Sequence, residues 1–263
     1  MAKKTAKLFN LKGKAIGKIN LPTVFNTPLR PDVIKRAVIA LQSHRRQPQG
    51  RDPMAGKRTT AESRGVGFGI ARIARLKGGS GRGAFAPGTV GGRIAHPPLS
   101  RKKIFKRIPK KEKRLALLSA IAATASKETV TSRGHSIEDV PGIPLIVTDD
   151  LESLKKTKEV EETLTHLGVL SDIYRVRESR KVRAGKGKRR GRKMKQAIGP
   201  LLVVVENKGV MEAARNVPGV DVATVNNLNP ETLAPGAHPG RLTIWTGGAI
   251  EKLNQLYGET EED

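Results

Sequence analysis

One stretch of this chain, residues 44–107, is too charged and too poor in apolar pattern to form a domain of its own. It contains sixteen lysine and arginine residues against only Asp52 and Glu62, together with twelve glycines. Such a segment cannot bury enough apolar surface to offset the entropy that its ordering costs. Amphipathic helices are predicted at both of its ends, and a loop of this length between them is expected to be functional. We therefore expect residues 44–107 to become ordered against a polyanion.

The charge of the whole chain points to nucleic acid. Its 263 residues include 50 lysines and arginines against 24 acidic residues, which gives a net charge of +26. A basic surface that is merely solvated is the alternative, but this imbalance is typical of nucleic-acid-binding proteins. Aromatic residues make up only 3% of the chain. Recognition should therefore rest on phosphates, close backbone approach and shape rather than on base stacking.

The composition disfavours several other classes of protein. No run approaches the roughly 20 apolar residues of a membrane-spanning helix, and the N-terminus lacks the apolar core of a signal peptide. Cysteine is absent, which excludes disulfides and thiolate metal sites. We therefore expect an intracellular protein that has no membrane association and needs neither a metal nor a cofactor.

From Pro141 onward the pattern is that of an α/β domain. Continuous apolar runs predict buried strands, and residues with helical spacing follow them. This alternation is typical of a mostly parallel sheet with helices on both faces. Gly168 is the predicted C-cap of the helix that contains Val160, Leu164 and Leu167. The predicted strands are 143–148, 201–205, 221–225 and 242–246, and the other predicted helices are 210–214 and 248–257, the last with Ile250, Leu253 and Leu256 inward.

The first half of the chain supplies further elements. Residues 11–20 predict a short hairpin with its turn near Gly13. A helix is expected from about residue 30 to 46, since Pro31 suits a first helical position. A second helix is expected over 109–126. Its predicted inward face comprises Leu115, Leu118, Ile121, Ala122 and Ala125.

These elements predict one α/β globular domain over residues 1–263. It carries the long basic, glycine-rich loop 44–107 as an insertion, a second basic segment at 175–195, and an acidic tail at 259–263 that we expect to be disordered. Lysines and arginines at 110–114 also crowd the start of a helix, where they oppose its dipole. They either contact phosphate or are solvated, and the preceding basic run favours phosphate.

The second basic segment has twelve lysines and arginines against Glu178 alone. Glycines at 185, 187 and 191 let the backbone approach phosphates closely, and arginine forks grip phosphate through two hydrogen bonds. A flexible solvated linker is the alternative, but a linker does not need so many mutually repelling charges. We expect residues 81–98 to bind RNA as well. Their glycines and prolines favour an irregular path that can pass between RNA helices, which are recognised mostly by shape and phosphate.

Enzymatic motifs are missing. There is no phosphate loop of the G-x-x-x-x-G-K-[ST] kind and no G-x-S-x-G nucleophile turn. Gly65, Gly67 and Gly69 follow no strand and make no dinucleotide fingerprint. The histidines are scattered, without a nearby acidic partner in the sequence, and are interpreted as structural or RNA-facing rather than as metal ligands. They are His44, His96, His135, His166 and His238.

Asp149 and Asp150 are the best enzymatic candidates, because they close a predicted parallel strand, where open α/β sheets place ligands. Paired carboxylates could hold Mg²⁺ for a nuclease. The favoured interpretation is instead that Asp150 caps the following helix. No catalytic residue is predicted.

Five stretches resemble one known family. They are LPTVFNTPLRPDVIKRAV (21–38), the loop through GGRIAHPP (91–98), RAGKGKRRGRK (183–193), AARNVPGVDVATVNNLNPETLAPGAHPGRLTIW (213–245) and the TGGAIEKL that follows. In this order they resemble the universal large-ribosomal-subunit protein number four family, of the archaeal and eukaryotic type. The length is similar to that of archaeal members.

The resemblance implies a non-enzymatic, cytoplasmic protein of the large ribosomal subunit, whose α/β domain lies on the outer side of the subunit and whose loop is buried in ribosomal RNA. It also implies that the loop reaches the peptide exit tunnel, with its tip within 58–93, beside the loop of protein twenty-two and the passing nascent peptide. The glycines expected to line the tunnel are Gly65, Gly67, Gly69, Gly78, Gly79, Gly81, Gly83, Gly91 and Gly92.

The sequence thus predicts a protein that binds ribosomal RNA and supports assembly of the subunit. An RNA- or DNA-binding regulator or chaperone acting off the ribosome is the alternative. The residues expected to bind RNA are Arg45, Arg46, Arg51, Lys57, Arg58, Arg64, Arg72, Arg75, Lys77, Arg82, Arg93, Arg101, Lys102, Lys103, Arg183, Lys186, Lys188, Arg189, Arg190, Arg192 and Lys193.

Overall fold

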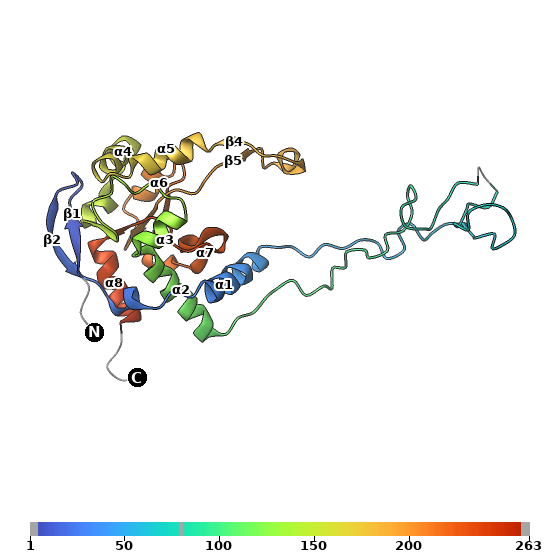
Figure 1. The fold of residues 1–263 in the computed structure, drawn as a ribbon, viewed down its shortest axis with the longest axis horizontal. Helices are drawn as coiled ribbons and strands as arrows, with labels where there is room; N and C mark the ends of the chain where they lie inside the picture. The colour runs from blue at the N-terminus through green and yellow to red at the C-terminus, as the bar shows by residue number, and fades with distance from the viewer. Residues whose placement is uncertain (1–4, 79–80, 259–263) are drawn as a thin grey trace. The chain divides into compact units, whose positions relative to one another are not determined.

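The structure, a computed structural model, describes residues 5–78 and 81–258 (Figure 1). It confirms the α/β class. The described residues fall into two compact units, one formed by residues up to 41 together with those from 107 onward, and the other by residues 42–106. The first is called the α/β unit here and the second the basic segment. The predicted acidic tail, 259–263, lies outside the described residues.

The main sheet of the α/β unit has six strands in the order β2-β1-β3-β8-β6-β7. Every neighbouring pair is parallel except β1 and β2, which form an antiparallel hairpin. The sheet is therefore mostly parallel, as predicted. Its strands are β1 (Thr5–Phe9), β2 (Ala15–Asn20), β3 (Leu145–Val147), β6 (Leu201–Val204), β7 (Asp221–Thr224) and β8 (Thr243–Thr246).

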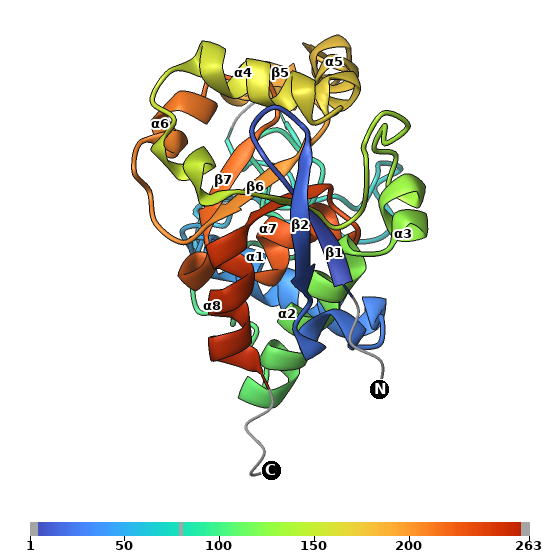
Figure 2. The same cartoon turned by 90° about the vertical axis from the view of Figure 1, so that its left-hand side faces the viewer.

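Eight α-helices occur in the described part of the chain, all but the last residues of α1 in the α/β unit. In Figure 2, α4, α5 and α6 lie on one side of the sheet, and α1, α2 and α8 lie on the other. The helices are α1 (Pro31–His44), α2 (Lys110–Thr124), α3 (Lys127–Ser132), α4 (Thr157–His166), α5 (Leu170–Glu178), α6 (Val210–Ala214), α7 (Pro230–Leu233) and α8 (Gly247–Tyr257).

The sheet separates two apolar clusters, because successive side chains of a strand point to opposite faces. Leu145 and Val147 of β3 pack with Leu164 of α4 in one cluster. Ile146, from between them, packs in the other cluster with Trp245 and with residues of α1, α2 and α8. Strands buried on both faces explain why the sequence shows continuous apolar runs rather than alternation.

The end of α4 follows the predicted glycine cap. Gly168 adopts a φ of +70°, and its N–H donates to the carbonyl of Thr165 at 3.0 Å while the N–H of Val169 donates to that of Leu164 at 3.0 Å. These two bonds make a Schellman motif, which satisfies carbonyls that the helix leaves free. A Cβ at Gly168 would meet the carbonyl oxygen of Asp139 at 2.1 Å. The position therefore requires glycine both for its backbone angle and for the space around it.

Three details of the predicted elements were wrong. The hairpin begins at Thr5 rather than at residue 11, although Gly13 does lie in its turn with a φ of +75°. Leu256, predicted inward, is exposed. In α2 the predicted stripe was displaced: only Ile121 of it is buried, and the other buried apolar residues are Ala116, Leu117, Ala120 and Ala123.

The error in α2 has a physical reason. The helix packs against two sets of neighbours at once. Leu117 and Ile121 join the apolar cluster that contains Trp245, while Ala116 packs with Val33 of α1. A helix that is apolar on several sides gives no single stripe in the sequence. The apolar residues alone therefore could not indicate which side faces the sheet.

A buried arginine, Arg241, ties together the strands at their amino-terminal ends. It is only 2% exposed, and its guanidinium donates to the carbonyls of Gly199 and Thr232 at 2.9 and 3.0 Å and to Asp221 at 2.5 Å. Burial lowers the pKa of Arg241, and the charge and hydrogen bond of Asp221 oppose that shift. A buried cation is tolerated where its hydrogen bonds are satisfied in this way.

Candidate nucleic-acid interface

The basic segment consists of two arms that run side by side in opposite directions. The rings of His44 and Phe105 are 5.5 Å apart, and a Cβ built on Gly50 would lie 3.3 Å from the backbone nitrogen of Ser100. Residue numbers rise along one arm and fall by nearly the same amount along the other. The segment is thus an irregular antiparallel pair, without a regular ladder of hydrogen bonds, in its described part.

At Gly56 the two arms come into close backbone contact. This glycine has a φ of +75°, and a Cβ there would lie 2.4–2.5 Å from the backbone of Gly92 and Arg93. The two arms therefore touch through backbone atoms, which only a residue without a side chain allows.

Beyond this contact, the far part of the segment is held by isolated bonds. Glu62 and Arg75 exchange two backbone hydrogen bonds of 3.0 Å, and Arg75 also bridges to Gly83. The ammonium of Lys77 lies 2.5 Å from a carboxylate oxygen of Glu62. The arginine side chain of Arg75 donates to the carbonyl of Gly81 at 2.8 Å. Single bridges of this kind fix a path without enclosing a core.

No residue of 45–106 belongs to an apolar cluster in the described structure. Apolar side chains of the segment stand in the open instead: Val66 is 73% exposed, Phe68 62% and Val90 78%. A segment with so little apolar burial has little to offset the entropy of its own ordering. Burial of its own apolar side chains therefore contributes little to holding the described part of the basic segment in place.

The predicted glycines serve two different purposes. Those with a left-handed backbone and open space beside them allow sharp changes of direction, and they are Gly65, Gly67, Gly69, Gly78, Gly81 and Gly91. Gly83 and Gly92 have ordinary φ values but touch neighbouring parts of the segment. Gly79 lies outside the described residues.

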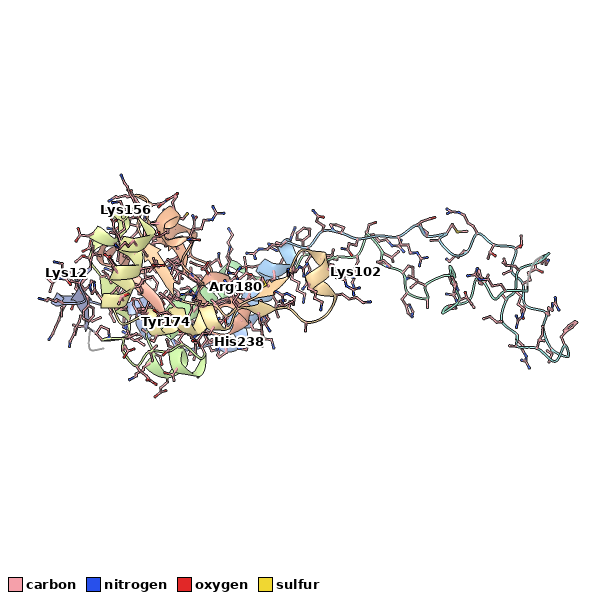
Figure 3. All side chains as sticks on the ribbon, turned by 90° about the horizontal axis from the view of Figure 1, so that it is seen from above. Lys12, Lys102, Lys156, Tyr174, Arg180 and His238 are labelled. Carbon is pink, nitrogen blue, oxygen red and sulfur yellow. The ribbon has the colours of Figure 1, made fainter. Side chains whose placement is uncertain are left out.

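Most of the predicted RNA-binding cations of the segment are exposed. Three are half-buried: Arg51, Arg75 and Arg93, the last with its guanidinium 5.6 Å from the ring centre of Phe85. Arg58 pairs with Asp52, whose pKa is lowered by a backbone hydrogen bond from Met54 and by Arg58. The exposed cations are Arg45, Arg46, Lys57, Arg58, Arg64, Arg72, Lys77, Arg82, Arg101, Lys102 and Lys103; Figure 3 labels Lys102 among them.

The second basic segment forms a small hairpin, which the sequence did not predict. β4 (Lys181–Val182) pairs with β5 (Met194–Lys195), and the 3-10 helix η3 (Lys186–Arg190) lies between them. The side chain of Arg183 donates to the carbonyl of Arg192 at 3.0 Å, which closes the hairpin. The remaining predicted cations point outward from it and are all exposed: Lys186, Lys188, Arg189, Arg190, Arg192 and Lys193.

The interpretation of Asp150 as a helix cap was wrong. Asp149 and Asp150 begin the 3-10 helix η2 (Asp149–Ser153), whose N-cap is Thr148. Asp150 accepts a hydrogen bond from the hydroxyl of Thr148 at 3.0 Å, and Asp149 accepts one from the N–H of Gly248 at 2.8 Å. Asp149 therefore accepts a hydrogen bond from a backbone N–H in the first turn of α8, across the carboxyl ends of β3 and β8.

No group of three or more potential metal-binding side chains comes together anywhere in residues 5–78 and 81–258. None of the helices within these described residues is both long and apolar enough to cross a membrane.

One histidine, His135, has an acidic partner that is distant in the sequence, and its burial agrees with the interpretation of the histidines as structural or RNA-facing. His135 donates from Nδ1 to a carboxylate oxygen of Asp172 at 3.0 Å, and both side chains are buried. Asp172 also accepts hydrogen bonds from Ser136 and Arg175. Burial alone would raise the pKa of Asp172, but the hydrogen bonds and charges of His135 and Arg175 outweigh it and lower that pKa. The pair is 37 residues apart in sequence, so no local pattern could have indicated it.

The sequence matches known proteins over nearly its whole length. The profile described as "Ribosomal protein L4/L1 family" matches residues 19–256. The "Large ribosomal subunit protein uL4" of Methanosphaera stadtmanae is 52% identical over 250 residues, which are 95% of this chain and 96% of that protein. The proteins of the same name from Methanopyrus kandleri and Saccharolobus islandicus are 49% and 48% identical, over 97% of this chain and 99% and 96% of theirs.

The resemblance expected from the sequence is thus confirmed, including its archaeal type. The family consists of structural proteins of the large ribosomal subunit, which are not enzymes. The chain belongs to the ribosomal protein L4/L1 family.

Proposed function

We propose that this chain binds large-subunit ribosomal RNA through the basic segment and the β4–β5 hairpin, and that it helps to assemble the subunit by ordering the basic segment inside that RNA. A structural role in the large subunit follows from the family. In that role, the partners of the chain are ribosomal RNA and other ribosomal proteins. The observation that carries the finer proposal is the basic segment itself, a separate unit that lacks an apolar core and presents a surface of cations.

RNA phosphates would compensate the positive charge of the basic segment. Sixteen cations at 44–107 against two carboxylates repel one another, and phosphates of a folded RNA would remove that repulsion while releasing counterions. Glycines with open space beside them let the backbone bend to follow the RNA surface. The α/β unit can fold first on its own core, and the basic segment then becomes ordered on RNA.

The destination of the basic segment rests on the family resemblance. We propose that its far part, within residues 58–93, lies at the wall of the peptide exit tunnel near the constriction, beside protein twenty-two, where a nascent peptide passes. The small, turned backbone around Gly65, Gly67 and Gly69 would suit such a wall.

The dependence of binding on salt tests the phosphate argument. The affinity of the full chain for large-subunit RNA should fall steeply with salt, with a log–log slope of about −0.7 to −0.9 for each phosphate contacted. Filter binding at increasing potassium chloride concentrations would measure it. An affinity that hardly changes between low and moderate salt would contradict the proposal.

Substitution of the hairpin tests the second contact. Arg189, Arg190 and Arg192 are all exposed at or beside η3. Their joint replacement by alanine should weaken RNA binding while the melting temperature of the α/β unit stays the same. Joint replacement of three exposed lysines elsewhere, Lys155, Lys156 and Lys158, provides a control of equal charge. Equal affinities of the two triple variants would remove the hairpin from the interface.

A regulator acting off the ribosome would behave differently in cells. If the proposal is right, the chain remains with the large subunit when a lysate is washed in high salt and sedimented. Recovery only in fractions free of ribosomes would favour the alternative.

A further inference from the structure

A cavity of about 690 Å³ opens on the α/β unit, and its lining includes neither described residues of the basic segment nor the exposed cations of the β4–β5 hairpin. It lies at the amino-terminal ends of β6 and β8, since its wall includes residues just before each of these strands, Gln196 and His238. This is the opposite edge of the sheet from Asp149 and from the edge where open α/β sheets usually bind ligands. Arg133, His135 and Arg175 also line it, together with the hydroxyl side chains of Thr129 and Ser132, and no acidic side chain lines it among the described residues.

Arg133 is a cation without a carboxylate partner in the described structure. Its guanidinium donates to two backbone carbonyls, those of Pro235, at 2.9 Å, and of His238. Burial and repulsion by Arg241 and Arg175 lower the pKa of Arg133 to about 10. A cluster of guanidiniums that carries more positive than negative charge is unfavourable unless an anion joins it.

The other polar groups of the cavity are already oriented. Asp172 lies behind its wall and holds both His135, at 3.0 Å from Nδ1, and Arg175, at 2.8 Å from Nε. Arg175 also donates to the carbonyl of Ile198 at 2.9 Å. The side chain of His135 is almost fully buried, lines the cavity and is oriented by Asp172.

The position of the cavity indicates the source of the anion. Arg175 begins the second basic segment, and Gln196 follows its last residue, so the cavity lies at the base of the β4–β5 hairpin. Because the cavity adjoins the base of the hairpin, a polyanion that contacts the exposed cations of the hairpin also passes close to the cavity. An acidic peptide would neutralise the positive charge of the cavity equally well. It would not explain why the cavity adjoins an arginine- and glycine-rich hairpin suited to phosphates.

We infer that this cavity binds a backbone phosphate of large-subunit RNA, held by Arg133 and Arg175, with Gln196, His135 and His238 as further hydrogen-bonding groups. This inference rests on the proposed function, because it adds a contact on the α/β unit to those of the two basic segments. It assigns the amino-terminal edge of the sheet to RNA.

A charge introduced at the mouth of the cavity tests the inference without disturbing the fold. His238 is exposed, and His238→Glu should repel a phosphate and lower the affinity of the full chain for large-subunit RNA by at least about tenfold at moderate salt. The control is Lys156→Glu, a larger change of charge at a side chain that is 79% exposed and lies well apart from His238 in Figure 3. Arg133→Gln should lower affinity similarly and make the salt slope shallower by about 0.7–0.9.

The outcomes separate this inference from the proposed function. Loss of affinity in His238→Glu but not in Lys156→Glu supports the phosphate site. Unchanged affinity in His238→Glu, together with weak binding by the triple arginine variant of the hairpin, overturns the site and leaves the proposed function standing. If none of the variants binds more weakly, both fail.

Cross-linking in intact subunits identifies the occupant directly. A photoreactive amino acid in place of Gln196, whose side chain is exposed at the cavity, should form an adduct with large-subunit RNA, whereas the same group at Lys156 should not. An adduct with a neighbouring protein at position 196 would mean that an acidic peptide fills the cavity. Either that result or the absence of any adduct would overturn the inference.

Discussion

The two units of this chain differ in how much of their structure is held by internal packing. In the α/β unit, strands buried on both faces pack against helices, and even the buried cation Arg241 has all its partners within the protein. In the basic segment the backbone is held by isolated bridges, and apolar side chains such as Val66 are exposed. This difference supports the proposal that the α/β unit folds by itself and that the basic segment becomes ordered on RNA.

Amide hydrogen exchange of the free protein offers the largest contrast. The amides of β6 and β8, in the centre of the sheet, should exchange only through global unfolding and be protected by several orders of magnitude. Those of 60–78 and 81–95 should exchange within seconds, because few of their backbone groups are paired. Exchange measured by mass spectrometry would show both. Slow exchange across the far part of the basic segment would mean that it is ordered without RNA.

Removal of apolar atoms should affect the two units unequally. Leu164 is fully buried between α4 and the sheet, so Leu164→Ala should lower the free energy of unfolding by about 2–5 kcal/mol. Val66→Ala, which removes apolar atoms from a side chain that is 73% exposed, should change it by less than about 0.5 kcal/mol. Urea denaturation monitored by the fluorescence of Trp245 would measure both. Similar losses in the two variants would contradict the division into a self-folding and a partner-dependent unit.

A pair of aspartates gives a smaller and pH-dependent contrast. Asp172 is buried with His135 and Arg175, whereas Asp52 and its partner Arg58 are exposed. Asp172→Asn should destabilise the α/β unit by roughly 2 kcal/mol at pH 7, while Asp52→Asn should leave its melting temperature unchanged.

The sign of the pH dependence follows from the pKa. Because the pKa of Asp172 is lower in the folded protein than its ordinary value of 3.8, its contribution to stability is complete above that value and is lost as the pH falls through the folded pKa. The difference between wild type and Asp172→Asn should therefore be constant near neutral pH and shrink below about pH 4. A difference that grows in acid would show that the pKa is raised instead.

Much of the α/β unit was predictable because the apolar runs in its sequence match the burial of the same residues in the structure. The runs 201–205 and 242–246 are continuous and apolar, and both form strands buried on two faces. Prediction failed where the sequence pattern was ambiguous, as in α2, which is apolar on more than one side. It also failed where contacts join distant residues, as between His135 and Asp172.

The candidate interface was predictable in composition but not in geometry. Charge and glycine content indicated both basic segments, because these properties need no folded context. The opposition of Gly56 to Gly92, and the closing of the β4–β5 hairpin by Arg183, arise from chain reversals that no apolar periodicity records. The cavity at Arg133 had no sequence signal, since its polar groups come from four separate stretches of the chain.

The backbone contact between the arms of the basic segment also limits how the chain can change in length. Gly56 must stay opposite Gly92, just as Gly50 stays opposite Ser100. A residue inserted in one arm alone would shift every later contact and place a side chain where only backbone fits. Insertions and deletions in these arms should therefore occur in compensating pairs, or else be confined to the far part beyond Gly56.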